Sequence, residues 1–458
     1  MDLAIRSDRI ITETGIFDGI IGVKNEKIIG LFTSDFGFSA NRTIDARGKV
    51  VLPGLIDTHT HIRFPGHPER EDFTTGTSAA AAGGITTIFE MPISTPGVRT
   101  AEIVRDRMKA ARESIVVDVA FYAGGGHDAQ SEFQAMADAG VIGFKIFLHR
   151  PQKGREHEFK GLYTIDDGML LSDLYELKKT GRLVCFHAEC DSILEFEREK
   201  LMSQGKTDYM THSDAHPVIA EVEAVSRVIL FAKETGVPVS IKHVTTPQAA
   251  RLIKEAKQQG VRMYAETCPQ YLFFTNKELE RYGPYAKINP PLRNESEKNE
   301  LWNYVVDGTI DYIGTDHAPF TKAEKELGME NIHLAPSGIP GFEAELPLLL
   351  TAVHDGRLSF EQLARLTATN QARIFEISDS KGSIAVGKDA DFAIVDPDLA
   401  WVLDHESMVT KSKDIAIIYD GIQVHGKVET TIVRGQVVYE NNQVKGIPGS
   451  GKVVVPNL

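Results

Sequence analysis

The chain has 458 residues, of which 42% are hydrophobic and 25% charged, and its formal net charge is −14. An acidic chain without a basic cluster is not expected to bind nucleic acid; its N-terminus lacks a signal-peptide core, and no apolar run is long enough to cross a membrane. The three cysteines, Cys185, Cys190 and Cys268, lack CxxC spacing, so we expect a cytoplasmic protein without disulfides or a membrane partner.

The two ends of the chain share one pattern. Residues 1–49 alternate between apolar and polar side chains, with turn signals between the alternating runs, and residues 380–458 do the same. Such alternation is typical of antiparallel strands with one buried face. We predict that residues 1–49 and 380–458 pair to form one small β-sandwich domain.

Residues 50–379 have a different pattern, in which short apolar runs alternate with amphipathic stretches. Strand–helix alternation predicts a parallel sheet with right-handed crossovers. Eight such units fit a (β/α)8 barrel, and a doubly wound sheet is the structural alternative. The predicted strands cover residues 50–56, 85–91, 116–122, 141–148, 183–187, 238–243, 261–266 and 311–315.

Polar residues crowd the end of the first predicted barrel strand. Asp57, His59, His61 and Arg63 occupy every second position after an almost continuous apolar run, so their side chains would share one face of the strand. Burying imidazoles there is unfavourable unless a partner compensates. A metal ion would compensate, because neutral imidazole is a good ligand for zinc and related metals.

Four other predicted strands end in residues of the same kind. Lys145, His187, His243 and Asp316 stand at or just after the carboxyl ends of their strands, the end of a barrel at which active sites lie. Taken singly, either histidine could be a hydrogen-bonded core residue, and Lys145 could form an ion pair inside the barrel. Their shared position together with His59 and His61 predicts a metal site instead.

A series of motifs along the whole chain resembles one enzyme family. The motifs are DTHTH, GGITTIFEMP, GFKIF, HAE, KHVTT, ETCPQYL, INPPLR, GTDHAP and GKDADFAIVD. In their order they resemble the amidohydrolase superfamily, and specifically its cyclic-amidase branch of hydantoinases (dihydropyrimidinases), allantoinases and dihydroorotases. Other segments, VDVAFYAGGG, EMPIS and ERYGPYAK, are most similar to the hydantoinase side, and the chain as a whole is most similar to L-hydantoinases and allantoinases.

The resemblance implies a centre of two divalent metal ions, commonly zinc. Lys145 would bridge the two ions as a carboxylated lysine, because a carbamate is an anion with two oxygens whereas an ammonium cannot bind a cation. The ligands so implied are His59, His61 and Asp316 for one ion, His187 and His243 for the other, and Lys145 for both.

The activity implied is hydrolytic opening of a cyclic ureide or amide. A metal-activated hydroxide would attack the ring, and Asp316 would carry its proton to the leaving nitrogen. Two alternatives stay open: a dihydroorotase, and a non-catalytic scaffold that has kept the barrel. Such scaffolds lack some ligands, whereas all six positions are filled here. The substrate is a small molecule, and a homo-oligomer, dimer or tetramer, is expected from the resemblance.

Five residues are candidates for substrate binding. Arg63 could hold a substrate carboxylate, as HIRFPG resembles dihydroorotases, or it could pair with Glu71 or Asp72. Ser94 stands where dihydroorotases usually have Asn, and His317 could instead support the site from behind. The long segment at residues 148–168 is predicted to be a mobile lid carrying Tyr163, the alternative being a plain surface loop. The candidates are Arg63, Ser94, Tyr163, Asn289 and His317.

Overall fold

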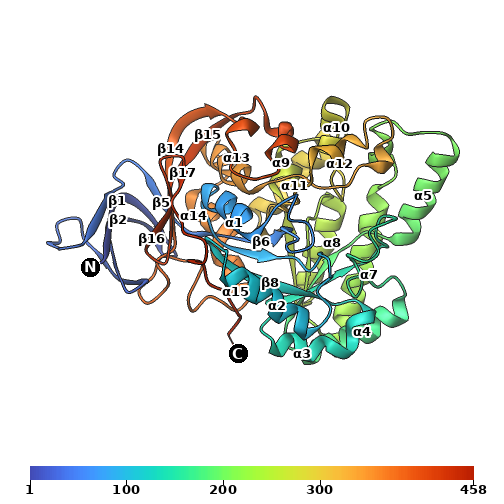
Figure 1. Cartoon of the computed structure of the whole chain (residues 1–458), viewed down its shortest axis with the longest axis horizontal. Coiled ribbons are helices and arrows are strands. Elements are labelled where there is room, and N and C mark those ends of the chain that lie inside the picture. The colour runs from blue at the N-terminus through green and yellow to red at the C-terminus, as the bar shows by residue number, and fades with distance from the viewer. Residues whose placement is uncertain (458) are drawn as a thin grey trace.

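The computed structural model describes residues 1–457 as two sheets packed side by side, with helices around the larger one (Figure 1). The larger sheet has eight strands in the order β6 to β13, and each neighbouring pair is parallel. A parallel bridge between Thr60 and His317 joins its two ends. Sequential strand order excludes the doubly wound alternative, so the predicted (β/α)8 barrel with a β-domain from both termini is confirmed.

Most barrel strands lie close to where the apolar runs predict them. They are β6 (Leu55–Thr60), β7 (Ile85–Glu90), β8 (Asp118–Gly124), β9 (Gly143–Phe147), β10 (Leu183–His187), β11 (Val239–Ile241), β12 (Met263–Thr267) and β13 (Tyr312–Ile313). The longer helices are α1 (Phe73–Ala82), α2 (Ala101–Arg112), α4 (Asp167–Lys179), α5 (Asp191–Ser203), α7 (Val218–Thr235), α8 (Pro247–Gln258), α11 (Glu295–Val306) and α13 (Phe342–His354). The short ones are α3 (Phe133–Asp138), α6 (Thr211–Asp214), α9 (Pro269–Phe273), α10 (Lys277–Tyr282), α12 (Lys322–Glu326), α14 (Phe360–Ala364) and α15 (Asn370–Ile374).

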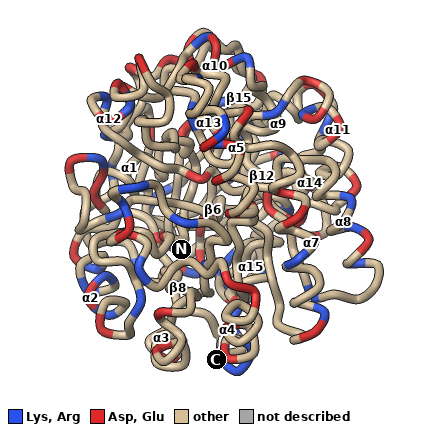
Figure 2. Tube along the Cα trace, turned by 90° about the vertical axis from the view of Figure 1, so that its right-hand side faces the viewer, with Lys and Arg blue, Asp and Glu red and all other residues tan. Residues whose placement is uncertain are grey.

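Helix α8 illustrates how the sequence specifies the outer helices. Thr246 caps its first turn, since the Thr246 hydroxyl accepts from the backbone N–H of Ala249 at 3.3 Å. Ala249, Ile253 and Ala256 are buried and recur at helical spacing on one face. Lys/Arg and Asp/Glu positions occur along outer helices such as α2 and α8 (Figure 2). The apolar stripe therefore packs each helix on the barrel and leaves the charges outside.

The second sheet is built from both ends of the chain and lies at the left of Figure 1. Strands β14 and β5 pair antiparallel and so join the two chain ends. The expected antiparallel pairing is incomplete, because β1 pairs parallel with both β4 and β5, and all nine strands form one hydrogen-bonded sheet. Its strands are β1 (Leu3–Thr12), β2 (Gly15–Lys24), β3 (Lys27–Phe32), β4 (Arg42–Asp45), β5 (Val50–Pro53), β14 (Phe392–Val402), β15 (Gln423–Val433), β16 (Gln436–Glu440) and β17 (Gln443–Val444).

The strand predicted at residues 50–56 is in fact two strands. Val50–Pro53 form β5 of the terminal sheet, and the first barrel strand β6 begins at Leu55. Gly54 separates them, and a Cβ at Gly54 would meet the Thr86 hydroxyl at 2.3 Å, so the chain crosses between the sheets where no side chain fits. We therefore propose that the domain boundary lies at Gly54 rather than between residues 49 and 50.

The bottom of the barrel is filled by a packed core. The ring of Phe375 lies edge-on to those of Phe89 and Tyr122, at centroid distances of 5.0 and 6.0 Å. This packing closes the barrel from below and leaves its carboxyl end for polar side chains. Among residues 1–457, no helix combines the length and the apolar character that a membrane crossing requires.

Candidate metal centre

Six side chains predicted as ligands meet at the carboxyl end of the barrel. His59 belongs to β6 and Lys145 to β9, and His187 is the last residue of β10. The others follow their strands directly: His61 after β6, His243 after β11 and Asp316 after β13. Five of the six line one pocket, the exception being Lys145, which is fully buried beneath it.

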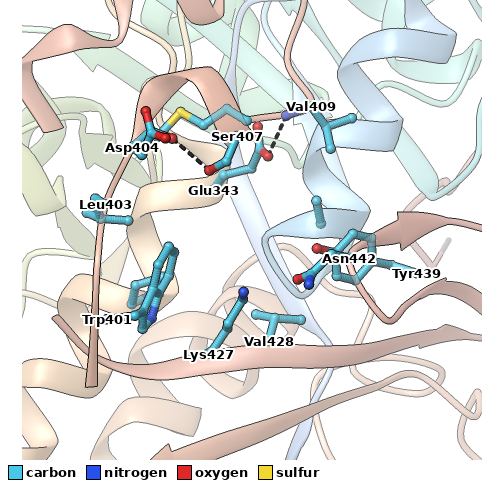
Figure 3. Close-up of a pocket in the computed structure, with 13 residues that line it drawn as sticks. Glu343, Trp401, Leu403, Asp404, Ser407, Val409, Lys427, Val428, Tyr439 and Asn442 are labelled. Carbon is cyan, nitrogen blue, oxygen red and sulfur yellow. Dashed lines mark hydrogen bonds between the residues drawn. The ribbon is translucent and has the colours of Figure 1, made fainter. Parts of the chain in front are cut away.

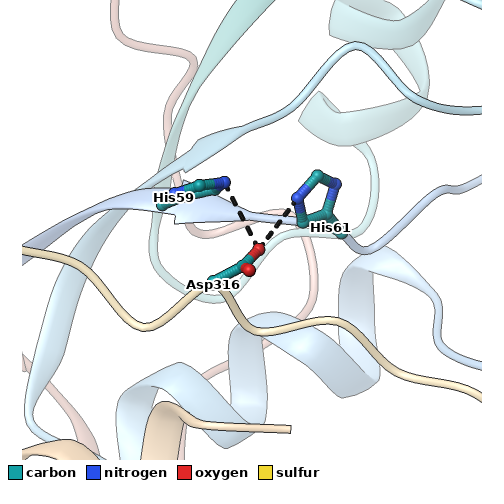
Figure 4. A group of neighbouring side chains, drawn as sticks. All are labelled: His59, His61 and Asp316. Atoms are coloured by element: carbon teal, nitrogen blue, oxygen red, sulfur yellow. Dashed lines mark ion pairs between the residues drawn. The ribbon is translucent and has the colours of Figure 1, made fainter. Parts of the chain in front are cut away.

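The first group of ligands is centred on Asp316 (Figure 4). The Nε2 atoms of His59 and His61 lie 3.3 and 3.1 Å from the same Oδ1 atom of Asp316. His59 Nδ1 faces Glu266 Oε1 at 2.6 Å, so its proton sits there and Nε2 carries a lone pair. Burial lowers the pKa of His59 to about 4 and raises that of Asp316. Lone pairs thus converge on one point, an arrangement that a divalent cation satisfies.

The second group is formed by His187 and His243, whose ring centroids are 4.4 Å apart. His187 donates from Nε2 to Glu189 Oε2 at 2.7 Å, and this hydrogen bond leaves its Nδ1 as the free lone pair. The ring of His243 also lies 5.3 Å from that of His59. The two groups are therefore contiguous, and each exposes unprotonated nitrogens to the pocket.

Lys145 lies between these groups without a partner. Its Nζ is buried and has no hydrogen-bond partner among residues 1–457, so the alternative of an ion pair inside the barrel does not hold. Burial, together with nearby Lys242, lowers the pKa of Lys145 to about 8. A lysine in this state has a larger neutral fraction near pH 7 than an ordinary lysine, and a neutral amine is the form that reacts with carbon dioxide. The side chains gathered at this end of the barrel thus fit divalent metal ions as ligands.

Two acids that hold the histidines were not singled out from the sequence. Glu189 also accepts from His216 at 2.8 Å, and Glu266 accepts from Lys242 Nζ at 2.7 Å. Although burial opposes it, Lys242 and His59 keep the pKa of Glu266 below its ordinary value. Both acids lie in motifs already noted, HAE and ETCPQYL, so a carboxylate near each histidine was the available signal.

Arg63 reaches the pocket as predicted, and its alternative role is wrong. It is 3% exposed, and its guanidinium lies 4.4 Å from the ring centroid of Phe320. Nη1 donates to the Pro319 carbonyl at 2.9 Å, but no carboxylate within residues 1–457 pairs with it. Burial and the neighbouring arginines lower the pKa of Arg63 to about 9.

The acids proposed as partners of Arg63 are engaged elsewhere. Glu71 accepts from the Thr410 hydroxyl at 2.6 Å, and Asp72 caps α1 by accepting from the backbone N–H of Thr75 at 2.8 Å. The guanidinium of Arg63 therefore faces the pocket without a carboxylate in ion-pair contact, although Glu158 and Glu90 lie near enough to favour its charge.

Of the remaining candidates, only Asn289 lines the pocket, with a buried Oδ1 that has no partner in the described chain. The Ser94 hydroxyl donates to the Arg63 carbonyl at 2.9 Å instead. His317 stacks on Phe342 at 3.8 Å, and its Nδ1 accepts from the backbone N–H of Gly341 at 3.1 Å. Ser94 and His317 do not line the pocket, and these contacts hold them behind it, which for His317 is one of the two roles expected. A contact of either with substrate stays a prediction.

The loop after β9 lies over the pocket, and its position agrees with a lid. Gln152, Arg155 and Phe159 line the pocket, and Arg155 Nη2 pairs with Glu158 Oε2 at 2.6 Å. Tyr163 does not line it; its ring packs with the apolar cluster that includes Phe159. The mobility of the loop and a substrate contact by Tyr163 stay predictions. His149, at the start of this loop, is a further lining residue that was not singled out.

The chain is similar over its full length to several known proteins. A profile described as Amidohydrolase family matches residues 50–438. The L-hydantoinase of Paenarthrobacter aurescens is 34% identical over 455 residues, which cover 99% of this chain and 98% of that protein. An allantoinase of Bacillus licheniformis is 36% identical over 453 residues, or 97% of each chain. The solved structure of an L-hydantoinase (dihydropyrimidinase) from Arthrobacter aurescens superposes with a TM-score of 0.94 at 34% identity, covering 99% of both chains.

Proposed function

The chain belongs to the amidohydrolase family, and we propose that it is a metal-dependent enzyme that opens the ring of a cyclic ureide or amide by hydrolysis. Its relatives are hydantoinases and allantoinases, and it is a hydrolase of that type. The observation that carries the proposal is the convergence of His59 and His61 on one oxygen of Asp316 beside the unpartnered Lys145.

We further propose that the centre holds two divalent ions, zinc by preference. His59, His61 and Asp316 would hold one ion, His187 and His243 the other, and a carboxylated Lys145 would bridge them. Bound ions of this kind supply an activated water nucleophile and polarise a carbonyl group. Support comes from the tautomers that Glu266 and Glu189 impose, because each leaves a histidine lone pair facing the pocket.

The residues of the chain then perform the proton transfers. Asp316, whose pKa is raised by burial, takes the proton of the attacking water and delivers it to the leaving ring nitrogen. Phe159 and Arg155 of the loop after β9 cover the pocket and exclude bulk water. The product of this reaction is a ring-opened carbamoyl or ureido acid.

An acidic or polar substituent on the ring is favoured by Arg63 and Asn289. Arg63 presents a buried guanidinium without a carboxylate partner, and Asn289 presents an unpartnered amide oxygen. A planar guanidinium suits a carboxylate better than an ammonium does. We therefore propose a cyclic ureide that carries such a substituent, without assigning the chain to the dihydroorotases. The scaffold alternative is disfavoured because all six ligand positions are occupied by suitable residues.

Two further expectations accompany this function. We propose that the enzyme works in the cytoplasm, since all three cysteines are free. We also propose a homo-oligomer, dimer or tetramer, which follows from the resemblance to hydantoinases.

A ring-opening assay tests the proposal. The metal-loaded enzyme is assayed with hydantoin, allantoin, dihydrouracil and dihydroorotate, and metal content is measured in parallel. Asp316→Asn is the matched variant, in which kcat should fall by orders of magnitude while the fold is kept. No ring opening by the loaded enzyme, or a near-normal kcat in Asp316→Asn, would contradict the proposal.

A further inference from the structure

A second cavity, of about 250 Å³, lies where the barrel meets the terminal sheet (Figure 3). Helix α13 supplies Glu343 to it, strand β14 supplies Trp401, and strand β15 supplies Lys427. The segment at residues 403–409 closes one side. None of its lining residues also lines the metal pocket, so the function proposed above does not account for it.

Part of the cavity wall is apolar. Trp401, Leu403, Met408 and Val428 form this part, and polar and charged side chains line the rest. The Trp401 indole donates from Nε1 to the Gly426 carbonyl at 2.9 Å, and this bond holds the ring in place. An aliphatic chain would pack against these side chains and leave little apolar surface in water.

Three charged side chains line the cavity: Glu343, Asp404 and Lys427. Asp404 is exposed and caps the following turn by accepting from the backbone N–H of Glu406 at 3.0 Å, whereas Glu343 and Lys427 lie on opposite sides without an ion-pair partner among the described residues. Glu343 accepts from the backbone N–H groups of Val409 and Thr410 at 2.7 and 3.1 Å, but within residues 1–457 it forms no ion pair. Lys427 likewise has no carboxylate within ion-pair distance there; its Nζ lies 5.1 Å from the ring centroid of Trp401. Figure 3 shows the two side chains on opposite sides of the cavity. Burial raises the pKa of Glu343 to about 7, as expected of a carboxylate without a cation beside it.

We propose that this cavity binds a small zwitterion whose ammonium group pairs with Glu343 and whose carboxylate pairs with Lys427. The apolar chain between the two groups would lie against Trp401. A ligand with a single charge would leave one of the two protein charges uncompensated, and charge-assisted hydrogen bonds at both ends make the dipolar ligand the better match.

The cavity is also connected to the metal centre by two sets of contacts. Phe342, adjacent to Glu343, stacks on His317 at 3.8 Å. Thr410, which donates its N–H to Glu343, donates its hydroxyl to Glu71, and Glu71 Oε2 lies 3.4 Å from His317 Nε2. His317 directly follows Asp316. A ligand bound to Glu343 would therefore affect both groups that contact His317, the ring of Phe342 and the carboxylate of Glu71. We therefore expect an occupied cavity to change turnover at the metal centre.

Fluorescence of Trp401 provides a direct binding test. The chain has two tryptophans, so Trp302→Phe leaves Trp401 as the only reporter, and calorimetry on the unmodified chain gives the same comparison without a substitution. The probes are 6-aminohexanoate, hexylamine and hexanoate, which share one chain length and differ only in their charged ends. We expect saturable binding of 6-aminohexanoate, about ten-fold tighter than either single-charge probe.

Two variants assign the ends of the ligand. Glu343→Gln should remove the advantage of 6-aminohexanoate over hexanoate, and Lys427→Met should remove its advantage over hexylamine. Equal binding of the three probes, no saturable binding, or unchanged preferences in both variants would overturn the proposal. None of these measurements requires ring-opening activity, so they are independent of the function proposed above.

The connection to the metal centre has its own readout. At saturating 6-aminohexanoate, kcat of the metal-loaded enzyme should change by about two-fold or more, whereas Lys427→Met should keep the basal kcat and lose the response. A kcat that stays constant while the fluorescence titration saturates would overturn the connection.

Discussion

Two buried lysines at opposite ends of the barrel have opposite surroundings. Lys145, at the metal pocket, has no hydrogen-bond partner among residues 1–457, and burial lowers its pKa to about 8. Lys381 lies near Asp118, the first residue of β8, and contacts Asp118, Asp391 and Asp389 at 2.6, 2.6 and 3.0 Å. Burial alone would lower the pKa of Lys381, but these carboxylates raise it. The unpaired Lys145 thus lies at the end of the barrel that carries the candidate metal centre. The fully paired Lys381 instead links the barrel to the terminal sheet.

The grouping of carboxylates by itself would not distinguish the two ends. Asp118, Asp389 and Asp391 are close enough together to hold a metal ion. The ammonium of Lys381 already lies among them, and Arg434 also binds Asp118. Charge balance therefore separates a structural cluster from a metal centre more reliably than proximity does.

The largest effect is expected from removing the unpaired lysine. Lys145→Ala should lose bound metal and reduce turnover by several orders of magnitude, because the substitution removes the proposed bridging ligand. Metal analysis and kcat measure the two losses, and short carboxylic acids should restore part of the activity by replacing the carbamate. Full activity in a metal-free Lys145→Ala protein would show that Lys145 has no such role.

The paired lysine should behave in the opposite way. Lys381→Met should lower the free energy of unfolding by about 3–5 kcal/mol, because it leaves buried carboxylates without their cation, while kcat per folded molecule stays the same. The pKa of Lys381 is raised in the folded state, so its contribution is complete at neutral pH and declines only above the ordinary lysine value of 10.5. Denaturant unfolding measures the change. An unaltered free energy of unfolding would mean that the ion pairs of Lys381 do not stabilise the fold.

Arg63 extends the contrast to substrate binding, since it is a second unpaired buried cation at the pocket. Arg63→Met should raise KM for an anionic cyclic ureide by an amount equivalent to about 2–4 kcal/mol and scarcely affect plain hydantoin. The test assays an anionic ring, dihydroorotate or carboxymethylhydantoin, side by side with the neutral ring of plain hydantoin. Equal effects on both would assign Arg63 a structural role.

The smallest effect is expected from a paired acid inside the metal pocket. Glu266→Gln keeps the size of the side chain but removes the charge that orients His59, so metal affinity should fall by about 10–100-fold. Competition with a chelator measures this change, and Glu189→Gln is the matched variant for His187. Unchanged metal affinity in both variants would mean that the backbone alone positions the histidines.

The barrel, and the meeting of the six candidate ligands at one end of it, could be predicted from the sequence for a simple physical reason. Parallel strands in a barrel bring their carboxyl ends to one face whatever the lengths of the connections. His59, Lys145, His187 and Asp316 therefore meet even though their separations along the chain are large. Only the alternation of strands and helices had to be recognised.

Residues outside the regular strands were placed less well. Ser94, Tyr163 and His317 lie in segments without a strand or helix period, so nothing in the sequence indicates which way their side chains point. The prediction of one strand at residues 50–56 was also wrong, because an apolar strand of the terminal sheet and one of the barrel have the same sequence pattern. Gly54 was the only local sign of the crossing.

By itself, the sequence determined the family, the barrel and which residues could hold a metal, because these depend on local periodicity and on residue chemistry. Tertiary structure alone decided which buried charges are balanced. The partner of Lys381 at Asp118 is 263 residues away along the chain, and Lys145 differs from Lys381 only in what folding places around it. Charge balance is a property of three-dimensional neighbours, so it is absent from any stretch of sequence.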